Sequence, residues 1–403
     1  MRLSEFKQRY RNNSLVYLIN HYAKRSLQTI RFYLEELRWR HKWKVTRPLG
    51  EVEVREIVRA RRRGCYSKPR GRLNIVYVGY GDRVCVGDGA GVLDKYAERN
   101  ILLALKRFGE VREFMVEYPG DCRSPLWSEK RVEIGRNLVG LIEGMPQTPD
   151  LLMGQMSGWL VDRSALEQLR LRGVLVINYS WDDTAGFYGT TINGAWSGPA
   201  ALASSGDLNL TSSRKSCLKY QAEGGLAVFW PEAANSDIHR PHDLPFEFEV
   251  SFVGGRYGYR PLLIEFLRKH GVEVATFGPG WEGGMLTGEE MVKLYSQSRI
   301  NLGFGGIGHM VKIQHLKGRD FEVPMSGGLY LTSYNSELEE CYEIGKEIVC
   351  YRDKRDCVEK IRYLLERPVE AEAIRKAGRE RALRDHTWER RLEQIFRLVG
   401  LLE

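Results

Sequence analysis

Short β-branched strands alternate with amphipathic helices along most of this 403-residue chain, and the alternation runs twice. The proline-rich stretch 231–247 separates the two series. Strands that alternate with helices in this way form a parallel sheet with helices on both faces. The pattern therefore predicts an α/β protein with two Rossmann-like, doubly wound domains. The expected strands are 73–78, 111–117, 150–153, 174–178, 208–211 and 227–230 in the first series, and 248–253, 272–277, 300–304, 329–332 and 347–351 in the second.

The rhythm also gives the predicted domain bounds: a basic helical N-terminal extension at 1–71, a first domain at 72–240 and a second at 241–403. No run of 18 or more apolar residues occurs, so the sequence predicts no membrane-spanning helix. The N-terminus lacks the apolar core of a secretory signal, and the seven scattered cysteines suit free thiols in a reducing compartment. We therefore expect a cytoplasmic protein.

Charge is unevenly distributed along the chain, whose net charge is +9. The first 73 residues hold 20 Lys and Arg against six Glu, whereas the remainder holds 41 Lys and Arg against 46 Asp and Glu. A nucleic-acid-binding protein would be more broadly basic, so we expect no nucleic-acid partner. The basic segment 1–70 fits two alternatives. It could lie on an anionic membrane surface, at the inner face of the membrane, or pack on its own protein or on a partner subunit in a homo-oligomer.

Ligands of open α/β sheets bind beyond the carboxyl ends of the strands, which directs attention to the loops there. The glycine-rich loop 79–91 follows the first strand but has Val84 where a dinucleotide-binding motif needs its third glycine. It is either a plain tight turn or a ligand loop. An aromatic and acidic segment, 179–183, follows strand 174–178. Aromatic faces stack on pyranose rings and carboxylates accept hydrogen bonds from sugar hydroxyls, although an aspartate here could equally cap the next helix. These loops supply candidates for contacts to a bound sugar, Gly81, Tyr179 and Trp181. They also supply three carboxylates that could act as a catalytic base, Asp82, Asp182 and Asp183.

The second series concentrates cations and glycines after its strands. Arg256 and Arg260 follow strand 248–253 at the start of a helix, where backbone N–H groups and guanidinium forks make an anion site. A diphosphate needs cations and N–H donors, and a ribose diol needs one carboxylate. The next loops meet both needs, with Gly305, Gly306, Lys312, Lys317, Arg319 and Glu322.

Four segments of the second series, FVGGRYGYR, KGRDFEVPMSGG, LTSYNSELEECYEIGKEIVCY and HTWERR, resemble the C-terminal domain of GT-B glycosyltransferases. The similarity is to the CgeB-like branch, related to a spore maturation protein, of the group 1 or family-4-like enzymes. NYSWDD and YQAEGGLAVFWPEAAN in the first series are more loosely similar, and the resemblance covers residues 72–395. It implies two Rossmann-like domains facing a central cleft. It also implies transfer of a sugar from a nucleotide-diphosphate sugar, with UDP favoured, to a glycan, lipid-linked or protein acceptor.

The resemblance implies roles for single residues as well. Glu322 would hold the donor ribose, and Asn335 would lie near the sugar or phosphate. The diphosphate would be held by Arg256 or Arg260 together with Lys312, Lys317 or Arg319. Related retaining enzymes carry a second glutamate eight positions before Glu322, where this chain has Gln314, so retention of configuration stays open.

No D-x-D motif occurs, and the pair His239 and His242 lacks a third metal ligand, so we expect no metal and no cofactor. Two alternatives to sugar transfer remain. One is a nucleotide-sugar epimerase of the same fold, and the other is a catalytically inactive nucleotide-sugar-binding scaffold, which the glutamine at position 314 would suit.

Overall fold

The computed structural model describes residues 14–42, 47–62, 71–80, 83–86, 89–92, 96–116, 126–192 and 194–403. The chain forms two compact units, each with its own parallel sheet. The N-terminal unit comprises Leu37–Asn235 and Thr387–Glu403, and the C-terminal unit comprises Ser236–His386 with the segment that ends at Glu36. These units differ from the predicted domains at both ends of the chain, because the extension divides after Glu36 and the last helix groups with the N-terminal unit.

The N-terminal unit contains a six-stranded sheet in the order β10-β9-β6-β5-β1-β4, with every neighbouring pair parallel. Its strands correspond to the six that the sequence predicts in this half. They are β1 (Leu73–Tyr80), β4 (Gly109–Val116), β5 (Leu151–Gly154), β6 (Leu175–Ser180), β9 (Leu208–Thr211) and β10 (Ala227–Phe229).

Alternate residues of β1 enter two separate core layers, because successive side chains of a strand point to opposite faces. Ile75 and Tyr77 pack with α3 (Glu51–Arg62), α4 (Tyr96–Phe108) and α15 (Trp388–Val399). Val76 and Val78 pack with α5 (Leu126–Glu143) and α6 (Arg163–Leu171) on the other face. Helices thus cover both faces of the sheet, which confirms the doubly wound prediction.

The C-terminal unit contains a five-stranded parallel sheet in the order β12-β11-β13-β16-β17. The strands are β11 (Phe248–Val253), β12 (Ala275–Phe277), β13 (Ser298–Leu302), β16 (Tyr330–Ser333) and β17 (Val349–Tyr351). The helices are α9 (Arg260–Lys269), α10 (Gly288–Gln297), α11 (Arg319–Met325), α12 (Leu338–Cys341), α13 (Lys354–Glu366) and α14 (Pro368–Asp385). The predicted capping box at the start of α10 is confirmed, since Thr287 and Glu290 exchange side-chain and backbone hydrogen bonds.

Two glycine-rich segments expected to be loops contain antiparallel hairpins instead. One consists of β14 (Gly306–Ile307) and β15 (Met310–Gln314), and the other of β2 (Arg83–Val86) and β3 (Gly89–Val92). Gly308 turns the first hairpin with a φ of 56°, a left-handed conformation that glycine adopts without a steric penalty. The remaining short elements are α7 (Asp183–Gly186), β7 (Thr191–Ile192), β8 (Ala195–Trp196), the 3-10 helix η1 (Pro199–Leu202) and α8 (Arg214–Ala222).

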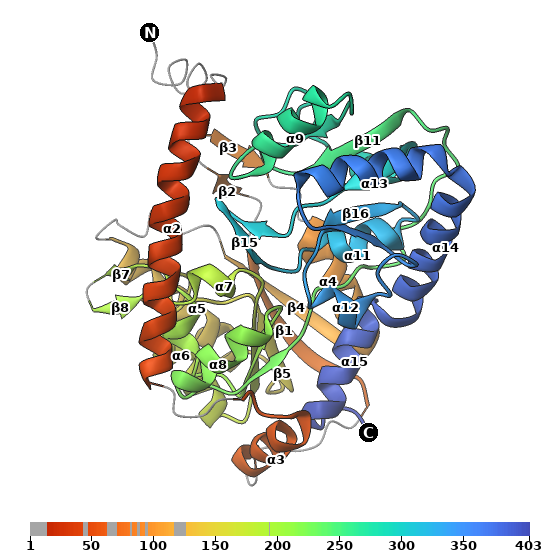
Figure 1. Ribbon diagram of the computed structural model, residues 1–403. Helices are drawn as coiled ribbons and strands as arrows, with labels where there is room; N and C mark the ends of the chain where they lie inside the picture. The colour runs from red at the N-terminus through yellow and green to blue at the C-terminus, as the bar shows by residue number, and fades with distance from the viewer. Residues whose placement is uncertain are drawn as a thin grey trace. The chain divides into compact units, whose positions relative to one another are not determined.

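Within its described residues, the N-terminal extension contains α3 and the 29-residue helix α2 (Ser14–Lys42), visible as the long helix in Figure 1. The first part of α2 packs on the C-terminal unit: the Tyr17 hydroxyl donates to the Gly258 carbonyl at 2.8 Å, and the His309 N–H donates to the Gln28 side chain at 2.9 Å. Its last part packs on the N-terminal unit, where Trp39 is buried. The helix therefore folds onto its own chain, as one of the two alternatives for the extension requires.

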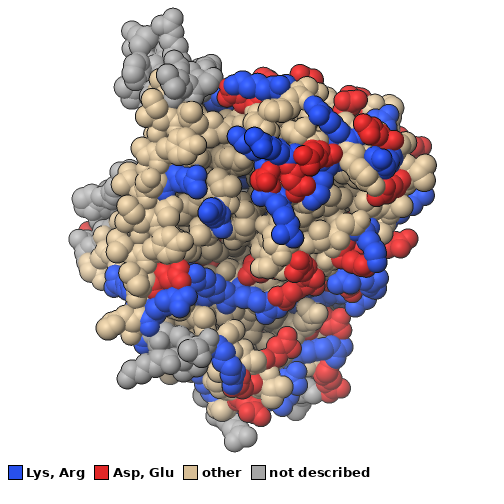
Figure 2. All heavy atoms as spheres, viewed as in Figure 1, with Lys and Arg blue, Asp and Glu red and all other residues tan. Residues whose placement is uncertain are grey.

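Acidic and basic side chains are interspersed on the face of the molecule in Figure 2. None of the helices within the described ranges has the length and apolar content needed to cross a bilayer.

Candidate functional site

Two arginines converge at the carboxyl edge of the C-terminal sheet. Arg260 opens α9 and Arg319 opens α11, and both guanidinium groups approach the backbone of Gly254, which directly follows β11. A Cβ added at Gly254 would lie 3.3 Å from Arg319 Nη1 and 3.4 Å from Arg260 Nη1. Gly254 has a φ of 149°, a backbone conformation that favours glycine. The edge thus brings two adjacent cations close to the backbone after β11.

Burial sharpens the electrostatics of this pair. The Arg260 side chain is buried, and its Nη1 donates to the Gly255 carbonyl at 3.0 Å. Both guanidinium groups also lie near the Phe252 ring, at 5.6 Å for Arg260 and 5.8 Å for Arg319. Burial, followed by the positive charge of Arg319, lowers the pKa of Arg260 to about 10. Two like charges held this close favour binding of a multiply charged anion between them.

A carboxylate with unusual protonation lies on the same helix. Glu322 follows Arg319 by three positions on α11, so the two side chains share one face of the helix. The Glu322 side chain is 16% exposed, and its Oε1 lies 4.0 Å from His239 Nε2. Burial raises the pKa of Glu322 to about 7; Arg319 acts in the opposite direction and Asp320 reinforces the rise. The group can therefore be either neutral or ionised near neutral pH.

Sequence reasoning missed His239 as a neighbour of this carboxylate. The imidazole is fully buried, and its Nδ1 lies 3.3 Å from the Ser326 hydroxyl. Burial lowers the pKa of His239 to about 3, so the ring is neutral at physiological pH. His239 and Ser326 are 87 positions apart, and the only local pattern around this histidine was the pair with His242. No local sequence signal could have placed it here.

Two further predicted donor residues, Gly305 and Asn335, lie in the loops after β13 and β16. The Gly305 N–H donates to the Ser333 hydroxyl at 2.7 Å, and that hydroxyl donates to Gln314 Oε1 at 2.9 Å. Gln314, at the position where related enzymes carry a glutamate, is thereby held between β15 and β16. Asn335 is buried and accepts the Glu337 N–H at 3.1 Å, which fixes the turn before α12.

The three other predicted donor residues in this region differ in exposure and position. Lys312 is exposed on β15, whereas Lys317 is half-buried and lies directly before α11. The Lys317 backbone N–H donates to the buried carboxylate of Asp320 at 2.7 Å, and the Tyr330 hydroxyl donates to the same carboxylate, also at 2.7 Å. Gly306 belongs to the hairpin strand β14 rather than to a loop. Asp320 thus fixes the turn that positions Arg319.

The structure gives Arg256 different neighbours from those of Arg260 and Arg319. Its guanidinium lies 5.8 Å from the Tyr17 ring and 5.5 Å from the Trp281 ring, and its backbone N–H donates to Pro279 at 2.8 Å. Arg256 also lines a cavity along α9 whose lining residues include neither of the other two arginines. Arg260 and Arg319, and not Arg256, therefore form the convergent pair of cations.

In the N-terminal unit, the structure contradicts Asp183 as a catalytic base. The side chain is fully buried and accepts a hydrogen bond from Thr211 Oγ1 at 2.9 Å. Burial raises the pKa of Asp183 to about 6, while Thr211, Lys219 and two further hydroxyl groups oppose that rise. An acceptor hydroxyl cannot reach a carboxylate that solvent cannot reach. Asp183 instead joins α7 to β9, which differs from the helix cap that the sequence offered as the alternative.

The aromatic candidates for the acceptor site are also part of the core. Tyr179 is buried, and its hydroxyl lies 2.7 Å from that of Tyr77. The Trp181 ring stacks on Trp230 with centroids 5.3 Å apart, and it lies 5.6 Å from Trp388. These contacts contradict a sugar-stacking role for Tyr179 and give Trp181 a packing role. Asp182 is exposed, and its side chain makes no capping bond to α7. Gly81 and Asp82 lie outside the described residues.

Comparisons with known proteins agree with this architecture. Residues 260–397 match a family described as glycosyl transferase-like. The structure resembles sucrose-phosphate synthase from Thermosynechococcus elongatus, with a TM-score of 0.57 and 16% identity over 81% of this chain and 98% of that one. It also resembles Anabaena HepE in complex with UDP and glucose, with a TM-score of 0.54 and 11% identity over 82% of this chain and 100% of that one.

A third similar structure is AviGT4, a glycosyltransferase involved in avilamycin A biosynthesis. Its TM-score is 0.53, at 15% identity over 81% of this chain and 97% of that one. Among curated proteins, none matches the sequence significantly. The chain therefore has the α/β fold of GT-B glycosyltransferases, and its residues 260–397 match a glycosyl transferase-like family.

Proposed function

We propose that this protein is a glycosyltransferase that takes its sugar from a nucleotide-diphosphate sugar bound by the C-terminal unit. The observation that carries the proposal is the convergence of Arg260 and Arg319 on Gly254, with Glu322 on the same helix as Arg319. The arginines suit a diphosphate, and an ionised Glu322 suits the two hydroxyls of a ribose. This combination of charges matches a nucleoside diphosphate better than a free phosphate.

In the proposed reaction, the bond between the anomeric carbon and the diphosphate oxygen breaks, and an acceptor oxygen forms a new bond to that carbon. The transition state has oxocarbenium character, and the negative charge grows on the departing diphosphate. Arg260 and Arg319 would stabilise that charge without a metal ion, since they are already held in place before the reaction. The acceptor proton must go to a base, for which Asp182 is the exposed candidate after β6.

A UDP-sugar is the donor that we favour, because the similar HepE structures hold UDP with glucose and UDP-glucose. The proposed acceptor is a glycan, a lipid-linked sugar or a protein. The family match argues for transfer over the epimerase and scaffold alternatives. Membership of the CgeB-like branch and independence from metals and cofactors remain predictions.

A binding panel tests the proposal. UDP, GDP, ADP and CMP, with the corresponding sugars, are titrated into the full chain while the unfolding temperature is measured. We expect stabilisation by one nucleoside diphosphate, of about 2.7 kcal/mol at 100 times its Kd. Release of that nucleotide should depend on added acceptor. Turnover to an epimer without acceptor would favour the epimerase, and binding without turnover would favour the scaffold. If no nucleotide changes the unfolding temperature, the proposal is wrong.

The adjacent residues Asp182 and Asp183 allow a matched test of which aspartate acts as the catalytic base. In Asp182→Asn, we expect the transfer rate to fall by about 10²- to 10⁴-fold with unchanged stability, because general-base catalysis typically contributes this factor. In Asp183→Asn, we expect a loss of about 1–3 kcal/mol of unfolding free energy, because the variant removes the negative charge near buried Lys219 and places an additional N–H donor in the core. Transfer kinetics and urea unfolding measure the two effects. Full activity of Asp182→Asn would exclude it as the base.

We also propose that α2 places the enzyme on an anionic membrane surface. The buried side chains Tyr17, His21, Phe32 and Trp39 follow one face of the helix. At 100° per residue, the opposite face carries large apolar side chains that are each more than half exposed, and exposed cations flank it. These apolar residues are Ile19, Tyr22, Leu27, Ile30, Tyr33, Leu34 and Leu37.

Sedimentation with vesicles tests this surface. We expect the full chain to bind vesicles that contain phosphatidylglycerol more strongly than pure phosphatidylcholine. The triple variant Leu27→Ser, Ile30→Ser, Leu34→Ser should lose more than about tenfold in partitioning, because each buried side chain contributes roughly 1.5–3 kcal/mol. The control variant Leu171→Ser, Val369→Ser removes two other highly exposed apolar side chains and should bind normally. Equal binding by all three proteins would contradict the membrane assignment.

A further inference from the structure

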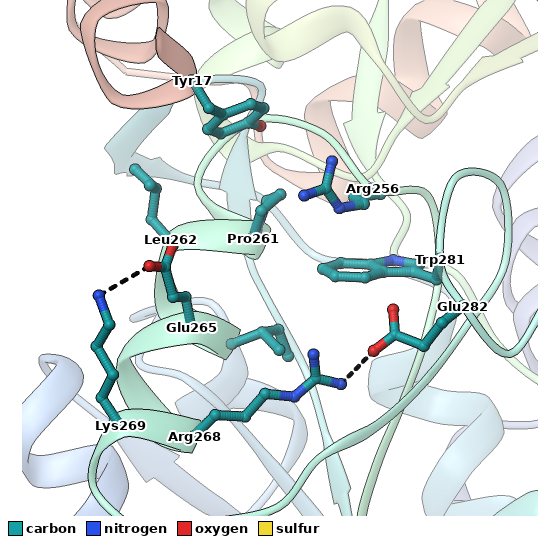
Figure 3. A pocket seen from close by; sticks show the side chains of 10 residues that line it. Tyr17, Arg256, Pro261, Leu262, Glu265, Arg268, Lys269, Trp281 and Glu282 are labelled. Atoms are coloured by element: carbon teal, nitrogen blue, oxygen red, sulfur yellow. Dashed lines mark hydrogen bonds and ion pairs between the residues drawn. The ribbon is translucent and has the colours of Figure 1, made fainter. Parts of the chain in front are cut away.

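A cavity of about 540 Å³ runs along α9 in the C-terminal unit. Figure 3 shows it between α9 and the loop that carries Trp281, with Tyr17 of α2 at one end. The size falls in the range of small-molecule sites. Its lining includes none of Arg260, Arg319 and Glu322, so it is separate from the proposed donor site.

Buried N–H donors without partners line this cavity. The Trp281 side chain is only 8% exposed, and among the described residues its Nε1–H has no hydrogen-bond acceptor. The same holds for Nε of Arg268, another lining residue. Buried donors are nearly always satisfied in proteins, and an unsatisfied one costs free energy. Both N–H groups are covered by neighbouring atoms in this conformation, so a ligand with acceptor oxygens would satisfy them once the covering side chains move aside.

The end of the cavity near Trp281 is cationic as well as aromatic. The Arg256 guanidinium lies between the rings of Tyr17 and Trp281, at 5.8 Å and 5.5 Å from their centroids. In Figure 3 the indole nitrogen of Trp281 faces the Arg256 side. A guanidinium beside an indole N–H is a donor arrangement for a phosphate or a carboxylate.

The other parts of the lining combine apolar and paired charged groups. Pro261 and Leu262 contribute apolar surface to the lining. Lys269 contacts Glu265 at 2.8 Å, and Arg268 contacts Glu282. These ion pairs present carboxylate acceptors and cationic donors to the same space. The flat aromatic surface suits the C–H face of a pyranose. The neighbouring hydrogen-bond donors and acceptors suit its hydroxyls.

We propose that this cavity binds an acidic sugar: a single pyranose whose phosphate or carboxylate group lies against Arg256 and the Trp281 indole N–H. The ring stacks on Trp281, and its hydroxyls bond to the charged side chains of α9. Glu282, next to Trp281, accepts from another hydroxyl. This site goes beyond the proposed function and does not depend on it, because the donor nucleotide binds to a different set of side chains.

Calorimetric titration of the full chain with four probes tests the assignment. Glucose 6-phosphate and glucuronate carry the two candidate acid groups, glucose lacks an acid group, and inorganic phosphate lacks the ring. We expect one of the acidic sugars to bind at least about tenfold more tightly than glucose and than phosphate, since a hydrogen bond to a charged group contributes about 1.5–3 kcal/mol. Which of the two binds identifies the acid group.

Three variants locate the binding. Trp281→Phe keeps an aromatic ring but removes the N–H, and Arg256→Gln removes the charge. Each should weaken the acidic sugar about tenfold or more, whereas Lys293→Gln, at an exposed ion pair on α10, should not. UDP binding should be unchanged in Trp281→Phe. The proposal is overturned if none of the probes binds at millimolar concentration, if both cavity variants bind normally, or if UDP displaces the sugar competitively. If the wild-type protein binds the acidic sugar but does not bind UDP, only the proposed function is contradicted.

Discussion

Replacing Arg319 with glutamine should weaken UDP-sugar binding by about 100-fold, because a forked guanidinium bond to a phosphate is among the strongest hydrogen bonds in proteins. Arg319 and Arg260 approach the same point beside Gly254, so the diphosphate would contact both. Arg260→Gln should have a similar effect. Calorimetry with UDP-glucose, at two salt concentrations, measures the loss. The dependence of the Kd on salt should also become shallower, because one cation of the pair is gone.

Exposed Arg299 in the same unit provides the matched control. Its guanidinium lies over the Phe246 ring, so Arg299→Gln makes the same chemical change away from the site. We expect this control to bind UDP-glucose normally. Arg319→Lys tests geometry, because lysine keeps the charge but loses the planar fork. If Arg319→Gln binds as tightly as the control, the diphosphate does not lie between these arginines, and the proposed donor site is wrong.

The affinity for UDP-glucose should rise about tenfold between pH 6 and pH 8, because only ionised Glu322 can accept both hydroxyl bonds of a ribose. Burial raises the pKa of this group to about 7, so the ionised fraction changes steeply across that interval. UDP-glucose suits the measurement better than UDP, since its esterified diphosphate has no terminal phosphate group that titrates near pH 6. Calorimetry at a series of pH values gives the profile.

Glu322 should also make the stability of the protein depend on pH. This dependence has the opposite sign to that of UDP-glucose affinity, because stability falls as the pH rises. The pKa of Glu322 is raised from 4.5 in the unfolded chain to about 7 in the folded one, so the folded state binds more protons across that interval. Stability should therefore fall as the pH rises from 4.5 to 7, by about 3 kcal/mol at most from this group. In Glu322→Gln, urea unfolding at pH 8 should show equal or greater stability than in the wild type.

The same variant decides the functional role of Glu322. In Glu322→Gln, we expect weak UDP-glucose binding whose pH profile is flat between pH 6 and pH 8. A wild-type profile that is already flat, or a steep profile retained in the variant, would show that another group titrates. If Glu322→Gln is at least as stable as the wild type but binds UDP-glucose weakly, then Glu322 serves ligand binding at a cost in folding stability.

Much of the fold could be predicted from the sequence because strands and helices depend on short-range patterns. The six strands of the N-terminal sheet and the capping box at Thr287 were predictable from apolar runs, glycines and the spacing of polar residues. The motifs around Arg260, Arg319 and Glu322 were equally legible, since each lies within a few positions of a strand end or a helix start. Such features need only neighbours along the chain.

Side-chain roles depended on contacts between distant segments. Asp183 and exposed Asp182 are adjacent in sequence, but only Asp183 is covered, by residues 28 or more positions away such as Thr211. Arg256 belongs to the same loop as Arg260, yet it lies against Tyr17 of the N-terminal helix. The sequence by itself therefore determined the architecture and the kinds of charge present. Only the tertiary structure decided which charges are buried, paired or exposed, because burial is set by segments that local patterns do not connect.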